Sequence, residues 1–152
     1  MIVGSLMRGR FTIHLSVEAD FPSVRLLAAA CHGVLAEWGL PPERRSLLEL
    51  AVVEAATNVV RHAYGGRGGR VEVELTREGG AIALSVVDTG TSLDPTRVPP
   101  PREPDPADPS TWPEGGMGLP IIRAACDELR YRAEGGRNRL TLHLRVEELD
   151  AT

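Results

Sequence analysis

Residues 47–64 read LLELAVVEAATNVVRHAY, and they are the most informative stretch of this 152-residue chain. The predicted helix begins at Pro41-Pro42-Glu43, runs to about Ala63 and is stopped by Tyr64-Gly65-Gly66. Apolar side chains surround nearly the whole of it, so we expect the helix to be largely buried. These apolar residues are Leu47, Leu48, Leu50, Val52, Val53, Val59 and Val60.

Two polar side chains interrupt this apolar helix. Glu54 and Asn58 are four positions apart, so they share one helix face. Burying a carboxylate and an amide without partners is costly, which leaves two interpretations open. Either they are paired internally, for instance in a salt bridge between Glu54 and Arg61, or they line a cleft. The same stripe continues through Thr57, Arg61 and His62.

Simple periodic patterns flank this helix on both sides. Residues 10–17 alternate apolar and polar side chains, which predicts a half-buried strand. Asp20 and Pro22 open a further helix that runs through Trp38 and is closed by Gly39. Downstream, residues 71–76 and 81–88 predict two strands joined by a tight turn at residues 77–80.

The second half of the chain begins with a change in composition. Residues 91–114 hold eight of the twelve prolines and have no apolar periodicity, which is typical of a functional lid or a disordered loop. A helix is predicted after Gly118, with Pro120 in its first turn. Its predicted apolar face comprises Ile121, Ile122, Ala125 and Leu129. A strand pair follows at 129–132 and 139–146, turning at Gly135-Gly136.

This order of elements predicts an α+β fold. Strand, two helices, two strands, lid, helix and two strands favour a two-layer sandwich, with a mixed, mostly antiparallel sheet and helices on one face. We expect residues 1–152 to form a single domain with a lid loop at about 91–114.

Composition excludes several classes of protein. The chain has a net charge of -4 and no apolar run of 18 residues, so neither direct nucleic-acid binding nor membrane insertion is expected. All 17 basic residues are arginine, which excludes lysine-dependent P-loops, eukaryotic-type protein kinases and pyridoxal enzymes in their usual form. Cys31 and Cys126 have no metal-site spacing, so we expect structural thiols in a cytoplasmic protein.

Two short motifs add candidate binding residues. VVDTG at 86–90 ends an apolar strand in Asp88, with Gly90 allowing close approach to the backbone. GGMGLP at 115–120 precedes a helix, where free backbone N–H groups favour an anion. Taken alone, the first motif is also typical of a turn and the second of a hinge.

Together, these motifs resemble a known family. A helical E-x-x-x-N, a D-x-G after a strand, a long lid and a G-x-G before a helix resemble the GHKL ATP-binding fold. EAATNVVRHAY and GGMGLPIIRAACDEL look like the bacterial anti-sigma factor serine/threonine kinases of the partner-switching type. The resemblance covers residues 11–146.

The resemblance implies ATP and Mg²⁺ as cofactors and gives the matching residues roles. It implies that Glu54 is the catalytic base, that Asn58 is the magnesium ligand, and that Asp88 accepts a hydrogen bond from the adenine amino group. It also implies nucleotide contacts at Gly90, Gly116, Met117, Gly118 and Leu119.

The chain departs from this family at two positions and leaves two roles open. Ser92 replaces the second glycine of D-x-G-x-G, and Asn138 stands near where a threonine is frequent. The sequence predicts no role for Asn138. His62 and Tyr64 match the family at the end of the helix, where packing and ligand contact are both open.

The predicted function is that of a kinase acting on other proteins. Because the segment before the first predicted strand is short, we expect neither the phospho-accepting hairpin of a histidine kinase nor transducing domains of the gyrase kind. The resemblance implies a protein that binds a sigma factor, phosphorylates a serine or threonine of an anti-sigma antagonist, and forms a homodimer. The alternative is a nucleotide-dependent protein-binding module without phosphate transfer.

Overall fold

The computed structural model describes residues 9–65, 67–92, 94, 106–107 and 118–146. The elements follow the predicted order, except that the last turn of the helix predicted to end at about Ala63 is π-helical. They are β1 (Arg10–Glu18), α2 (Phe21–Glu37), α3 (Pro42–Asn58), the π-helical turn η1 (Val59–Ala63), β2 (Arg70–Glu78), β3 (Ala81–Asp88), α4 (Gly118–Ala124), β4 (Glu128–Glu134) and β5 (Arg137–Arg145).

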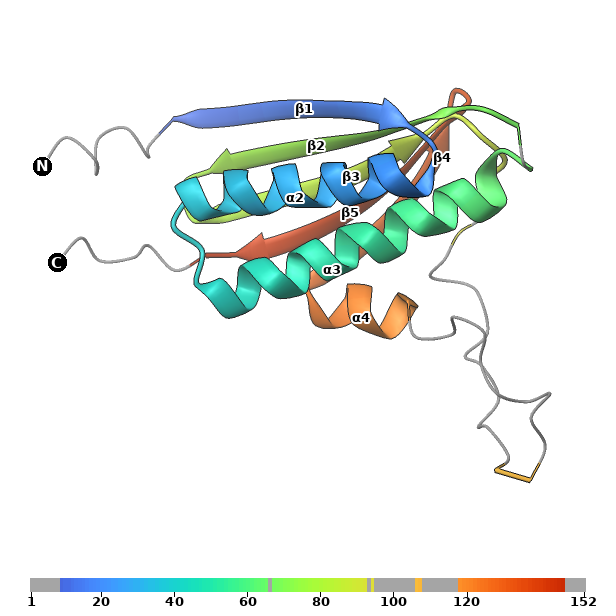
Figure 1. The fold of residues 1–152 in the computed structure, drawn as a ribbon. Coiled ribbons are helices and arrows are strands. Elements are labelled where there is room, and N and C mark those ends of the chain that lie inside the picture. The colour runs from blue at the N-terminus through green and yellow to red at the C-terminus, as the bar shows by residue number, and fades with distance from the viewer. Residues whose placement is uncertain (1–8, 66, 93, 95–105, 108–117, 147–152) are drawn as a thin grey trace, which may run out of the picture.

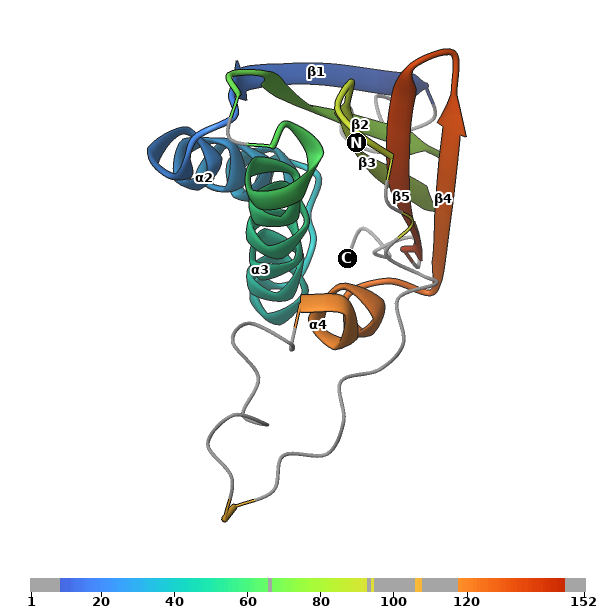
Figure 2. The same cartoon turned by 90° about the vertical axis from the view of Figure 1, so that its right-hand side faces the viewer.

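The five strands form one sheet in the order β1-β2-β3-β5-β4. Every pairing among the described strands is antiparallel, so a mixed sheet is not needed to describe this part of the chain. Helices α2 and α3 run side by side along one face, with α4 next to α3 (Figure 1). Figure 2 shows all three helices on the same side of the sheet. The predicted α+β sandwich is therefore confirmed.

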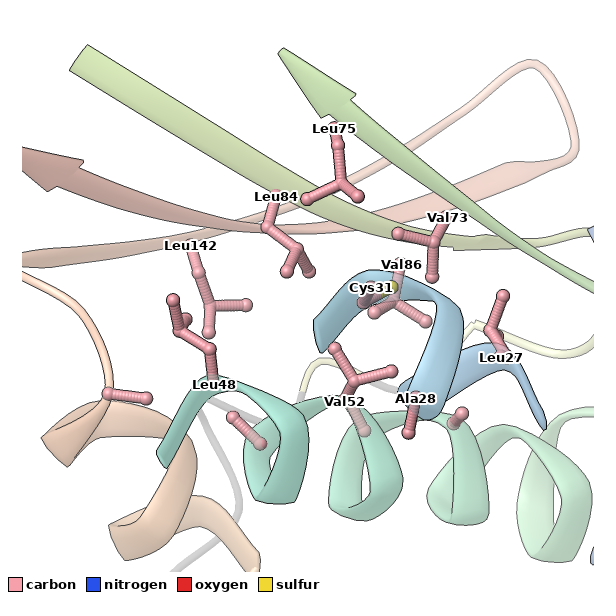
Figure 3. Close-up of a cluster of buried hydrophobic side chains, with 14 of the residues drawn as sticks. Leu27, Ala28, Cys31, Leu48, Val52, Val73, Leu75, Leu84, Val86 and Leu142 are labelled. Carbon is pink, nitrogen blue, oxygen red and sulfur yellow. The ribbon is translucent and has the colours of Figure 1, made fainter. Parts of the chain in front are cut away.

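The hydrophobic core lies between the sheet and the helices. Alternate residues of β2 and β3 point to the helices, because side chains in a strand alternate between its two faces. Leu48 and Val52 of α3 are four positions apart and enter the same space from the helix layer. Figure 3 shows this cluster, which includes Leu27, Ala28, Cys31, Leu48, Val52, Val73, Leu75, Leu84, Val86 and Leu142.

The beginning of α2 follows the predicted capping pattern. The carboxylate of Asp20 accepts a hydrogen bond from the backbone N–H of Ser23 at 2.8 Å, which satisfies one of the free donors at the helix start. Hydrogen bonds from Ser23 lower the pKa of the Asp20 carboxyl. Pro22 stands in the first turn, where its missing N–H costs nothing.

Two details of the predicted helices are wrong. Leu50 is 44% exposed, although the apolar pattern predicts a buried position. Helix α3 is covered by the sheet, α2 and α4, and Leu50 lies outside this cover. Leu129 belongs to β4, opposite Leu142, because α4 already ends at Ala124.

None of the described helices is long and apolar enough to cross a membrane.

Both cysteines are free thiols, as expected, and Cys31 is fully buried in the core. Burial raises the pKa of the Cys31 thiol to about 12. Because the thiolate is the reactive form, we expect a thiol reagent at pH 8 to leave Cys31 unlabelled in the native protein and to label it in denaturant. Mass spectrometry of a Cys126→Ser variant isolates the Cys31 signal. Labelling of Cys31 under native conditions would contradict this burial.

Candidate functional site

The polar stripe of α3 meets the first residue of α4. Glu54 and Asn58 are both half-buried. A Cβ atom placed on Gly118 would lie 3.0 Å from Glu54 Oε2 and 3.9 Å from Asn58 Nδ2. The structure thus brings together three predicted site residues from two helices. Glycine at position 118 avoids a close contact with the Glu54 carboxylate, because a side chain there would begin 3.0 Å from Oε2.

Arg61 and His62 do not continue this stripe. The π-helical turn at Val59–Ala63 adds a residue to the turn and rotates the side chains that follow Asn58. Arg61 and His62 are exposed, and the Arg61 guanidinium lies 6.0 Å from the centre of the Phe21 ring. Among the described residues no ion pair involves Glu54, so the salt bridge with Arg61, given as an example of internal pairing, is not formed.

The π-helical turn contacts the segment that follows β3. The carbonyl oxygen of Ala63 accepts a hydrogen bond from the backbone N–H of Thr91 at 2.6 Å. A Cβ atom on Gly90 would lie 2.2 Å from the same oxygen, which no real side chain tolerates. Close backbone approach therefore requires glycine at position 90. This contact brings the D-x-G motif against the end of the helical stretch that carries Glu54 and Asn58.

Asp88 is the last residue of β3, and it is buried with 9% exposure. Its Oδ1 accepts hydrogen bonds from the backbone N–H of Gly90 at 2.9 Å and from Asn138 Nδ2 at 2.8 Å. Asn138 Nδ2 also donates to the carbonyl oxygen of Gly90 at 2.9 Å. The sequence offers two weak signals for Asn138: it stands near a position where the family frequently has threonine, and it is one of just two side-chain amides, the other being Asn58.

Tyr64 has a structural role at the border of the site. Its hydroxyl donates to the carbonyl oxygen of Arg70 at 2.6 Å and accepts from the backbone N–H of Thr89 at 3.1 Å. The Tyr64 ring fills the space next to Gly69, where a Cβ atom would lie 2.4 Å from ring atoms. Tyr64 thus connects the helix end, the beginning of β2 and the residue after Asp88.

Some predicted site residues cannot be placed. Gly116 and Met117 lie outside the described residues, as does most of the predicted lid at 91–114. Gly118 and Leu119 form the first turn of α4 and are buried and half-buried, respectively. Ser92 is exposed. Within the described part of the chain, no group of three or more histidine, cysteine or acidic side chains could hold a metal ion.

The comparisons with known proteins identify the family of this chain. Residues 17–144 match the histidine kinase-like ATPase domain family. The chain is 32% identical over 136 residues to the serine-protein kinase RsbW of Listeria monocytogenes, a match that covers 85% of this chain and 83% of that protein. It is 34% identical over 102 residues to the serine/threonine-protein kinase BtrW of Bordetella bronchiseptica, covering 64% and 68% of the two chains.

A solved structure supports the fold independently. The crystal structure of the RsbU and RsbW domains of a Mycobacterium tuberculosis protein matches 89% of this chain with a TM-score of 0.63 and 22% sequence identity. This chain spans 32% of the length of that solved chain. The predicted resemblance to relatives named as serine- and serine/threonine-protein kinases is confirmed, and the chain belongs to the histidine kinase-like ATPase domain family.

Proposed function

We propose that this protein is an ATP-dependent serine/threonine kinase that acts as an anti-sigma factor in the cytoplasm. It binds a sigma factor and phosphorylates an anti-sigma antagonist protein. The observation that carries the kinase proposal is the meeting of Glu54 and Asn58 with Gly118. A carboxylate and a side-chain amide next to the first residue of α4 would provide a general base and a cation ligand.

Asn58 would hold Mg²⁺ through its side-chain oxygen. Magnesium commonly takes one or two protein oxygens and fills its remaining positions with phosphate oxygens and water, so a single half-buried amide next to Glu54 fits this ion. When bound, the ion supplies positive charge that offsets the charge of the phosphates.

Glu54 is proposed to act on the target hydroxyl. The oxygen of the target serine or threonine forms a bond to the γ-phosphorus of ATP, and the bond from this phosphorus to the β,γ-bridging oxygen breaks. ADP leaves, and the Glu54 carboxylate takes the hydroxyl proton. Such transfers depend mostly on positioning and charge, which is why a correctly placed carboxylate matters.

The adenine base is proposed to bind at the end of β3. The Asp88 carboxylate would accept a hydrogen bond from the adenine amino group, and Gly90 would admit the base next to the backbone. Gly116, Met117, Gly118 and Leu119 complete the proposed nucleotide contacts. The partner proteins and a homodimer are proposed from the family resemblance.

A transfer assay tests this function. The purified chain is incubated with γ-labelled ATP, Mg²⁺ and a candidate antagonist, and we expect label on a serine or threonine of the antagonist. Omitting Mg²⁺ should abolish the label. Nucleotide-dependent binding of the antagonist without any label would favour the binding-module alternative. If the chain binds no adenine nucleotide, both the kinase proposal and the binding-module alternative are overturned.

A further inference from the structure

Asp88 and Asn138 form a buried polar pair in an otherwise apolar layer. They face each other at the end of the β3–β5 ladder, and Asn138 is 5% exposed. The nearest pairs on the same side of these two strands are apolar, namely Val86 with Leu140 and Leu84 with Leu142. A polar pair in this place needs a reason beyond packing, because two apolar residues would fill it at lower cost.

The orientation of the Asn138 amide is dictated by its neighbours. The amide faces Asp88 Oδ1 and the carbonyl oxygen of Gly90, and both of these atoms only accept hydrogen bonds. Only the nitrogen of the amide can satisfy them, so the assignment does not depend on distinguishing nitrogen from oxygen. Asn138 thus holds the Asp88 carboxylate and the following loop backbone with one donor group.

The two carboxylate oxygens of Asp88 differ in their hydrogen bonds. Both donors recorded among the described residues, Asn138 Nδ2 and the Gly90 N–H, bind Oδ1. These two bonds restrict rotation of the carboxylate, and Oδ2 receives no hydrogen bond recorded among the described residues. We propose that Asn138 is a positioning residue that makes Asp88 a fixed acceptor and thereby selects a purine with an amino group at C6. This inference rests on the proposed binding of adenine nucleotide at Asp88.

The expected selection favours adenine over hypoxanthine. Adenine presents an N–H donor at C6, which Oδ2 can accept. Hypoxanthine carries a carbonyl oxygen at the same place, and a fixed carboxylate oxygen repels it. A carboxylate that could rotate would discriminate less, because water could enter between the two oxygens. The measurable quantity is the ratio of the dissociation constants for ITP and ATP.

The first test removes the positioning residue. Wild type is expected to bind ATP at least about tenfold more tightly than ITP, and Asn138→Ala should reduce this ratio by about tenfold, the effect of one hydrogen bond to a charged group. Ser85→Ala is the matched control, because Ser85 Oγ and Thr141 Oγ1 share a partly buried hydrogen bond of 2.9 Å across the same two strands. Its ratio should equal that of wild type.

The second test reverses the selection. In Asp88→Asn, which keeps the shape, the amide oxygen must occupy the place of Oδ1 to accept from Asn138 and Gly90. Its NH₂ group then faces the ligand as a donor, so this variant should prefer ITP over ATP. Adding Asn138→Ala lets the new amide turn more freely, so the double variant should show a weaker reversal.

The outcomes separate the inference from the proposed function. An unchanged ratio in Asn138→Ala, or an equal reversal with and without Asn138, overturns the positioning role while nucleotide binding stands. A wild type that binds ATP and ITP equally overturns the selection in the same way. A wild type that binds neither nucleotide overturns the proposed function at its base. Circular dichroism of each variant establishes that the ratios refer to folded protein.

Discussion

Glu54→Gln is expected to lower the rate of phosphate transfer by about 10²- to 10⁴-fold, the usual contribution of a positioned general base. Glutamine keeps the size and polarity of the side chain, so its contact with Gly118 is preserved. It cannot take the proton of the target hydroxyl. Affinities for nucleotide and for the sigma factor should remain unchanged, because neither depends on this proton transfer. Single-turnover transfer from labelled ATP measures the effect.

Glu49→Gln is the matched control for this change. Glu49 lies on the same helix and is also half-exposed, but its carboxylate binds His32 Nδ1 at 2.7 Å, between α2 and α3. The Glu49→Gln variant should transfer phosphate at the wild-type rate. If Glu54→Gln also transferred phosphate at the wild-type rate, Glu54 would have a structural role and the base would have to be sought elsewhere.

Asp88→Ala is expected to weaken ATP binding by roughly 10- to 150-fold, which corresponds to about 1.5–3 kcal/mol for a hydrogen bond to a charged acceptor. The substitution removes the carboxylate that would accept a hydrogen bond from adenine. It also leaves Asn138 Nδ2 and the Gly90 N–H without the oxygen that they share, in a place with little access to water. Titration calorimetry with ATP in the presence of Mg²⁺ measures the loss.

Asp127→Ala provides the comparison for Asp88. Asp127 Oδ2 accepts the backbone N–H of Arg145 at 2.7 Å, so this carboxylate also binds a backbone donor, but at the opposite end of β5. Removing it should leave the ATP affinity unchanged. Equal affinities in Asp88→Ala and wild type would contradict the assignment of the adenine position.

The elements with strong local signals could be predicted from the sequence. The alternation in 10–17, the Asp20 cap and the glycine turn at Gly135-Gly136 each depend on neighbours in the chain, and each lies where it was predicted. The spacing of Glu54 and Asn58 likewise determines that they share a helix face. These features need no knowledge of distant residues.

The features that were missed depend on contacts between distant residues. The role of Asn138 arises from the register of β3 and β5, which places it opposite Asp88 although 50 positions separate them in the chain. The π-helical turn accompanies the contact of Ala63 with Gly90 and Thr91, which no local pattern encodes. The exposure of Leu50 depends on which faces of α3 are covered by the sheet, α2 and α4.

The pairing of β3 with β5 has a consequence for how this protein folds. The β2–β3 and β4–β5 hairpins each close through a short turn and can form within about 1–10 μs, whereas joining them requires the closure of a long loop. Asp88 and Asn138 lie at this late junction. A nucleotide held there would bind only the fully joined sheet, so it should slow unfolding while leaving the rate of refolding almost unchanged.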